Sequence, residues 1–319
     1  MATSSMIPKH QRLLGGLWGS LAGDALGVPV EFRPRPSLTA DPVTDMRGFG
    51  THHQPAGTWS DDSSLLLCTT ESLLTGSFNP ADLAARFVKW KNENLWTPHG
   101  SVFDIGIATS TAISRLAAGT HPLTAGGSSE NSNGNGSLMR ILPLTLFCAA
   151  DPTESMTASL AMASCLTHAH PRSPLACAIF GLIVRPLLDG ATPADALASA
   201  ASLFPTTAAA LAPAELPHFN RLLNPAFASL PEHEIHGSGY VIHTLEASLW
   251  CLLNTTSFAE ATLRAVNLGE DTDTTGCVTG GIAGILYGID AIPTAWINSL
   301  ARHDDVAALF DRFLRVIPH

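Results

Sequence analysis

The chain has 319 residues, of which 45% are hydrophobic and only 14% are charged, and its formal net charge is −10. A chain of this length can bury a large core, and so little charge means that many whole elements must be buried. The negative charge excludes an electrostatic nucleic-acid binder, because phosphate contacts need a basic surface. The abundance of alanine and leucine favours helices over strands.

The predicted elements are helices separated by loops, after a disordered start over residues 1–10. Helical patterns are expected, in chain order, over residues 11–26, 61–74, 80–90, 105–118, 153–168, 174–188, 193–203, 240–253, 258–267 and 274–287. Long loops are expected over residues 31–58, 91–103, 121–137 and 212–237. We find no alternating strand pattern, internal repeat or linker, so the sequence predicts one all-α domain over residues 11–319.

The location of the protein is predicted from its cysteines and its apolar stretches. The chain has no CxxC pair, which indicates buried free thiols in a reducing cytoplasm at Cys68, Cys148, Cys165, Cys177, Cys251 and Cys277. Residues 13–30 contain Asp24 and several glycines and lack a clear cleavage site, so we reject a signal peptide there. We find no uninterrupted apolar run of the roughly 20 residues that a membrane span needs. A soluble, cytoplasmic protein is expected.

Glycines recur every fourth residue in the first predicted helix and again in the last one. The first ridge is Gly15, Gly19, Gly23 and Gly27, and the second is Gly276, Gly280, Gly284 and Gly288. An interior glycine costs a helix about 1 kcal/mol relative to alanine, so a compensating gain is needed. Glycine ridges let helix backbones approach closely, and we predict such packing in the middle of the bundle. Accidental glycine richness is the alternative.

Two short acidic clusters lie far apart in the sequence, each directly before an apolar, helical stretch. They are Ser60-Asp61-Asp62-Ser63 and Glu270-Asp271-Thr272-Asp273-Thr274. Carboxylates this close repel one another unless a cation or a proton neutralises them, and all-oxygen ligand sets suit Mg²⁺ or Mn²⁺. If the fold joins the clusters, they form a metal centre. Helix capping is the alternative for either cluster alone.

Three further features offer candidate ligand contacts. The glycine-rich stretch Asn133-Gly134-Asn135-Gly136-Ser137 precedes an apolar run and can present N–H groups to phosphate, although a flexible turn is the alternative. The chain lacks a P-loop lysine and a GxGxxG motif, which excludes ordinary ATPase and Rossmann folds. His168 and His170 lack a partner motif for zinc, so a ligand-contacting or core histidine is expected. Tyr240, at the head of a predicted helix, is interpreted as either a core residue or a ligand-stacking ring.

Taken together and in order, these segments resemble the ADP-ribosylglycohydrolase family. The matching segments are Gly19-Ser20-Leu21-Ala22-Gly23-Asp24-Ala25-Leu26-Gly27, Glu31-Phe32, Gly57-Thr58-Trp59-Ser60-Asp61-Asp62-Ser63, Asp104-Ile105-Gly106, Gly134-Asn135-Gly136-Ser137-Leu138-Met139-Arg140, Thr167-His168, Gly239-Tyr240-Val241 and Asn267-Leu268-Gly269-Glu270-Asp271-Thr272-Asp273-Thr274-Thr275-Gly276. Each motif alone is modest, but their joint order is specific and spans about residues 15–288.

The resemblance implies an all-α, compact orthogonal multi-helix bundle with two Mg²⁺ or Mn²⁺ ions in a cleft. By this likeness the metal ligands are Ser60, Asp61, Asp62, Asp271, Asp273 and Thr274. The residues that hold the diphosphate and distal ribose of ADP-ribose would be Gly134, Asn135, Gly136, Ser137 and Met139. Asp104, His168 and Tyr240 would line the cleft, and Glu31 matches a glutamate near the scissile bond.

The implied activity is hydrolysis of the bond between C1″ of ADP-ribose and a modified acceptor, with ADP-ribose as a product. The expected acceptor is a protein side chain, arginine or serine, and a monomeric enzyme is expected. Asp62 or Glu31 would act as acid or base, and we expect Glu31 to position the water or the leaving group. The alternatives are another metal-dependent hydrolase of ADP-ribose-like nucleotides and a non-catalytic ADP-ribose-binding protein.

Two features depart from the family's usual pattern. Ser60 and Ser63 stand where the family usually has threonines, and serine keeps the hydroxyl that would bind a metal. Glu270 stands where glycine is often found, and its side chain could be harmless or could reach the groups around the metal ligands.

Overall fold

The computed structural model describes residues 7–318, which contain α-helices and short 3-10 helices and no strand. The all-α prediction is confirmed. The α-helices are α1 (Lys9–Gly27), α2 (Arg35–Ala40), α3 (Asp61–Leu73), α4 (Pro80–Glu93), α5 (Ile107–Ala117), α6 (Leu142–Phe147), α7 (Thr153–Cys165), α8 (Arg172–Leu188), α9 (Pro193–Leu211), α10 (Val241–Leu253), α11 (Phe258–Val266), α12 (Thr272–Tyr287), α13 (Thr294–Ser299) and α14 (His303–Leu314). The 3-10 helices nearest the site described below are η1 (Val28–Val30) and η2 (Gly50–His52).

The first helix begins before the predicted boundary. Residues 1–6 of the predicted disordered start lie outside the described residues, but the prediction is wrong for residues 7–10, because Lys9 and His10 belong to α1. The Ile7 side chain contacts the backbone of Gly288, and the Gln11 side chain donates to Asp290 over 3.1 Å. These contacts fix the start of α1 against the end of α12, which the local sequence does not reveal.

Four α-helices were not predicted. The short helix α2 lies within the expected loop 31–58, α6 lies in the apolar run after the glycine-rich stretch, and α13 and α14 follow the last predicted helix. The spacing of Val306, Leu309, Phe310 and Phe313 places all four on one buried face of α14. The other boundaries differ from the predicted ones by a few residues at each end, except that α9 continues to Leu211.

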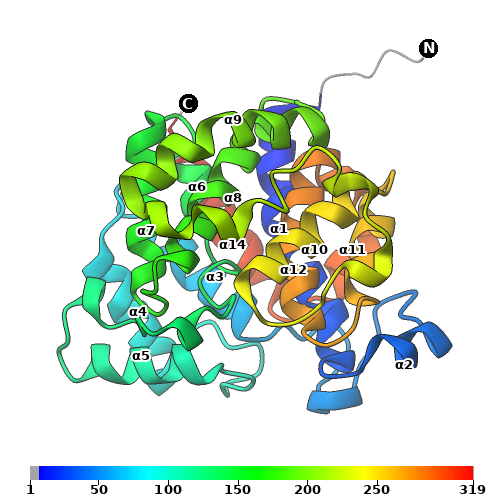
Figure 1. The fold of residues 1–319 in the computed structure, drawn as a ribbon. Coiled ribbons are helices and arrows are strands. Elements are labelled where there is room, and N and C mark those ends of the chain that lie inside the picture. The colour runs from blue at the N-terminus through cyan, green and yellow to red at the C-terminus, as the bar shows by residue number, and fades with distance from the viewer. Residues whose placement is uncertain (1–6, 319) are drawn as a thin grey trace.

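The two glycine ridges face each other along α1 and α12, which lie side by side in the middle of the molecule (Figure 1). A methyl group added at Gly15, Gly19 or Gly23 would overlap the carbonyl oxygen of Gly284, Gly280 or Gly276, respectively, and the reverse overlaps also occur. The predicted close packing is therefore confirmed. It brings the C-terminal end of α1 beside the N-terminal end of α12.

The segment Lys9–Val30 meets the length and hydropathy of a membrane span, but 94% of its most apolar window is buried inside the protein. The buried apolar residues of this segment belong to one apolar core, whose members come from the whole chain between Leu13 and Ile317. The six cysteines are free thiols, and all but the partly buried Cys165 are buried, as predicted.

Candidate functional site

The two acidic clusters meet where the N-terminal ends of α3 and α12 adjoin. The Thr274 hydroxyl donates to Asp62 Oδ1 over 3.3 Å and so links residues 212 positions apart in the chain. Ser60 caps α3 by accepting from the Asp62 N–H over 3.2 Å, which bears out part of the capping interpretation. Asp271 stands at the N-cap of α12, but its side chain makes no capping bond. Capping alone therefore does not account for the second cluster.

Asp24 lies beneath the first cluster and was not predicted as a site residue. Its carboxylate accepts from the Ser60 N–H over 2.9 Å, from the Ser63 N–H over 3.0 Å and from the Ser63 hydroxyl over 2.5 Å. Asp24 is fully buried in α1 and thus fixes the turn that presents Asp61 and Asp62. The signal for this role was an acidic residue within a ridge of glycines.

A left-handed turn positions the second cluster. Gly269 and Glu270 have φ values of +83° and +65°, and the Glu270 side chain is exposed. The Phe32 N–H donates to the Glu270 carbonyl over 2.6 Å, and the Glu270 N–H donates to the Arg33 carbonyl over 2.8 Å. These bonds tie the start of α12 to the segment that carries Glu31. The positive φ explains why glycine suits position 270.

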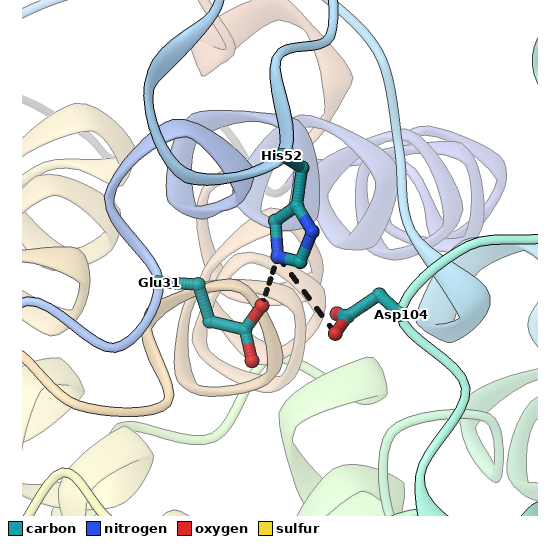
Figure 2. A group of neighbouring side chains, drawn as sticks. All are labelled: Glu31, His52 and Asp104. Carbon is teal, nitrogen blue, oxygen red and sulfur yellow. Dashed lines mark hydrogen bonds and ion pairs between the residues drawn. The ribbon is translucent and has the colours of Figure 1, made fainter.

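Glu31 joins both parts of the site. It offers an oxygen within 4.8 Å of ligand oxygens from Asp271 and Asp273, and it forms a second group of this kind with His52 and Asp104. Figure 2 shows His52 Nε2 facing the Glu31 carboxylate, to which it is hydrogen bonded, with Asp104 Oδ1 3.7 Å away. His52 was missed because it lies in a loop without a periodic pattern.

A cavity of about 360 Å³ opens above these groups, and most of the predicted site residues line it. The predicted residues in its wall are Glu31, Asp61, Asp62, Asp104, Gly134, Asn135, Gly136, Met139, His168, Asp271 and Thr274. Phe32, Gly239 and residues 105–109 complete the wall and were not predicted as site residues. Acidic groups and the glycine-rich loop thus share one cavity.

Four of the predicted site residues lie outside this wall. Ser60 and Asp273 are buried behind the carboxylates that line it. Ser137 is fully buried and accepts from the Ser164 hydroxyl over 2.9 Å, so its side chain faces the protein interior. The ring of Tyr240 is half-buried and packs edge-on against His243 with ring centres 5.0 Å apart, beside the Arg172 guanidinium.

The glycine-rich loop is held rigidly in place. The Asn135 N–H donates to the Gly239 carbonyl over 3.0 Å, and the Asn135 amide donates to Asp271 Oδ2 and to the Thr244 hydroxyl, each over 2.9 Å. The buried Arg140 guanidinium donates a hydrogen bond to the Gly136 carbonyl. These bonds argue against the alternative of a plain flexible turn. Helix α6 begins only at Leu142, so a further turn separates the loop from that helix.

His168 closes the wall behind this loop as a neutral imidazole. Burial lowers the pKa of His168 to about 3, and the nearby Arg140 charge acts in the same direction. The Thr167 hydroxyl accepts from Arg140 over 2.7 Å and lies 2.8 Å from His168 Nδ1. With the proton of this hydroxyl donated to Nδ1, the ring proton stands on Nε2, near Gly134 and Gly136. His168 offers the cavity a hydrogen-bond donor without a charge.

The carboxylates of the site repel one another in a buried setting. Burial raises the pKa of Asp61, Asp62 and Asp273 well above the usual range, and neighbouring carboxylates raise it further. Burial, followed by the charge of Asp271, raises the pKa of Glu31 to about 8. Such a group is stable at neutral pH only if protons or a cation neutralise it.

The residues present fit a divalent cation. Asp62 Oδ2 is buried and has no hydrogen-bond partner among the described residues. An unpaired buried carboxylate oxygen is costly, whereas a hard cation would bind it directly. The other groups around it are carboxylate and hydroxyl oxygens, the ligands that Mg²⁺ and Mn²⁺ prefer.

Without a cation, we expect the protein to lose stability as the pH rises from about 5 to about 8. Burial raises the folded-state pKa of Asp104 to about 7 and that of Glu31 to about 8, so each group keeps its proton in the folded protein above its usual pKa of about 4, and stability falls until the pH passes the raised value. The melting temperature in EDTA should fall by several degrees across this window. Millimolar Mg²⁺ should remove most of that fall by binding only the folded protein. A melting temperature that changes neither with pH nor with added Mg²⁺ would contradict this expectation.

The family model for ADP-ribosylglycohydrolase matches residues 6–319. The chain belongs to the ADP-ribosylglycohydrolase family. The resemblance drawn from the sequence motifs is therefore confirmed.

Individual relatives are similar in sequence to this chain over nearly its whole length. The chain is 31% identical to the ADP-ribosylarginine hydrolase Tri1 of Serratia proteamaculans (strain 568), over 98% of this chain and 82% of that protein. It is 30% identical to the ADP-ribosyl-(dinitrogen reductase) glycohydrolase of Rhodospirillum rubrum, over 91% and 90%. A solved structure described as an ADP-ribosylglycohydrolase-related protein complex superposes with a TM-score of 0.82 at 34% identity, over 97% and 99%. The protein is thus an ADP-ribosylglycohydrolase, a hydrolase of glycosyl bonds that removes ADP-ribose from an acceptor.

Proposed function

We propose that this ADP-ribosylglycohydrolase is metal-dependent and releases ADP-ribose from a modified arginine side chain of a protein. The observation that carries the proposal is the meeting of both acidic clusters in the same cavity as the glycine-rich loop. Carboxylates and the loop at residues 134–136 line the same cavity, and the Asn135 amide, which donates to Asp271 and Thr244, joins them. In an ADP-ribosyl group the loop would hold the diphosphate, and the carboxylates would surround the reacting C1″.

The oxygens of Ser60, Asp61, Asp62, Asp271, Asp273 and Thr274 would hold two Mg²⁺ or Mn²⁺ ions. When bound, the ions would supply positive charge for the ribose hydroxyls and for a nearby water. The buried position of Asp62 and its bond from Thr274 suit it to metal binding, and Glu31 lines the same cavity.

In this proposal Glu31 is the acid or base at the scissile bond. Cleavage passes through an oxocarbenium-like state, which needs an activated water and a proton for the leaving group. Burial raises the pKa of Glu31 to about 8, so the group can hold or release a proton near neutral pH. His168 Nε2–H would donate to the bound ligand, and the loop at residues 134–136 would bind the diphosphate.

Arginine is favoured as the acceptor by the match to a relative named ADP-ribosylarginine hydrolase over 98% of this chain. The carboxylates of Glu31 and Asp104 in the cavity wall would also stabilise a guanidinium. A serine acceptor offers no such charge. Action as a cytoplasmic monomer stays a prediction.

The test is a panel of substrates that carry ADP-ribose on arginine, on serine or on a nucleic-acid end, each assayed with Mg²⁺, Mn²⁺ or EDTA. We expect release of free ADP-ribose from the arginine substrate with either metal, and a loss of more than about 100-fold in EDTA. Full activity in EDTA would overturn the metal dependence. Faster release from serine than from arginine would overturn the acceptor, and release of phosphate instead of ADP-ribose would overturn the reaction.

A further inference from the structure

The loop that carries His52 is built onto the segment that carries Glu31. In η2, Gly50 has a φ of +60° and lies so close to the Pro29 carbonyl that a side chain would overlap it. The next residue, Thr51, donates its hydroxyl to the Glu31 carbonyl over 2.7 Å. His52 then reaches the Glu31 carboxylate (Figure 2). Three successive residues of η2 therefore contact η1 and Glu31.

The His52 ring has little freedom to move. Its centre lies 6.0 Å from that of Phe32 and 5.4 Å from that of Phe103. Only 15% of the His52 side chain and 7% of the Glu31 side chain are exposed to solvent. A restricted ring that meets a buried carboxylate fixes the orientation of that carboxylate, as supporting residues do in preorganised sites.

The contact with His52 involves only one of the two carboxylate oxygens of Glu31. An ionised carboxylate only accepts hydrogen bonds, so His52 Nε2–H donates to Oε2 when Glu31 is ionised. Oε1 takes no part in the contact with His52. Asp104, whose Oδ1 lies 3.7 Å from the same nitrogen, keeps His52 turned toward this side of the cavity.

We propose that His52 is a positioning residue, which holds Glu31 by one oxygen so that the other faces the scissile bond. This inference rests on the proposed acid or base role of Glu31. His52 is not among the residues that line the cavity. It acts through Glu31 alone, and this makes the inference testable by a double-mutant cycle.

The experiment measures turnover, KM and ADP-ribose affinity of the full chain with Mg²⁺ and an arginine-ADP-ribosylated protein. H52A should lower kcat by about 10- to 100-fold, the usual effect of losing a partner that orients a reacting group, with KM and ADP-ribose Kd within about 3-fold. H52Q should recover most of kcat, because its amide nitrogen stands near the place of Nε2. H52N, whose amide is too short to reach Glu31, should behave like H52A and repeats the test if H52A loses the fold.

His53 provides a matched control, because it is exposed, adjacent in sequence and has a φ of +54° that asparagine tolerates. H53N should leave kcat unchanged. The decisive comparison is H52A in the E31Q background, which should be no slower than E31Q alone. Additive losses, or an H52A enzyme with parental kcat, would overturn the positioning role while leaving the role of Glu31 intact. An E31Q enzyme with parental turnover would overturn both.

Discussion

Replacing Glu31 with glutamine is expected to lower turnover by about 100- to 10,000-fold, the range that general acid or base groups contribute. Glutamine keeps the size of the side chain and can still hydrogen bond to His52, but it cannot exchange a proton with a water or a leaving group. ADP-ribose affinity should stay within a few fold, because the loop at residues 134–136 and His168 are untouched. Single-turnover rates and calorimetric binding of ADP-ribose measure the two quantities separately.

E270Q is the control for this change. Glu270 is exposed, and the bond that joins it to the site is made by its main chain, so turnover should not change. Loss of a cation would also slow the E31Q enzyme, since Glu31 lies close to Asp271 and Asp273. Raising Mg²⁺ to saturation distinguishes the two causes. Recovery of turnover at high Mg²⁺ would assign Glu31 to cation binding, and parental turnover at any Mg²⁺ concentration would refute a catalytic role altogether.

The elements that the sequence predicted well are those with a strong local pattern. The glycine ridges marked out α1 and α12 in the sequence. They also predicted the close contact between these helices, because eight glycines at helical spacing are costly unless another backbone lies against them. Helix capping, stated as the alternative for either acidic cluster, is confirmed for the first cluster at Ser60. The helices α2 and α13 are only six residues long and leave too little pattern to detect. The amphipathic face of α14 was detectable in the sequence and was overlooked.

The site could be predicted wherever a motif supplies the residues, and not where the fold supplies them. Short acidic runs contain Asp61, Asp62, Asp271 and Thr274. The structure brings these residues together, which was the stated condition for a metal centre. His52 reaches the site only through the long-range contact of η2 with η1, which no local pattern reveals.

Whether these groups meet at all depends on the contact between α1 and α12, and replacing Gly23 with alanine tests it. At the paired glycines each helix presents backbone to the other, so the methyl group added at Gly23 would overlap the Gly276 carbonyl oxygen. Neither helix can yield without separating the flanking glycine pairs. Overpacking of a core costs about 1–3 kcal/mol where side chains adjust, and backbone against backbone should exceed that range.

We therefore expect G23A to be insoluble, or to melt more than about 4 °C below the parent by circular dichroism. Gly106→Ala is the control, since position 106 has a φ of −59° and the nearest atom to an added methyl is Thr109 Oγ1 at 3.9 Å, so stability should change by less than about 0.5 kcal/mol. A G23A protein as stable as the parent would mean that the two ridges do not pack as described. In that case the start of α12 need not lie beside Asp24, and the convergence of the two acidic clusters would lose its physical basis.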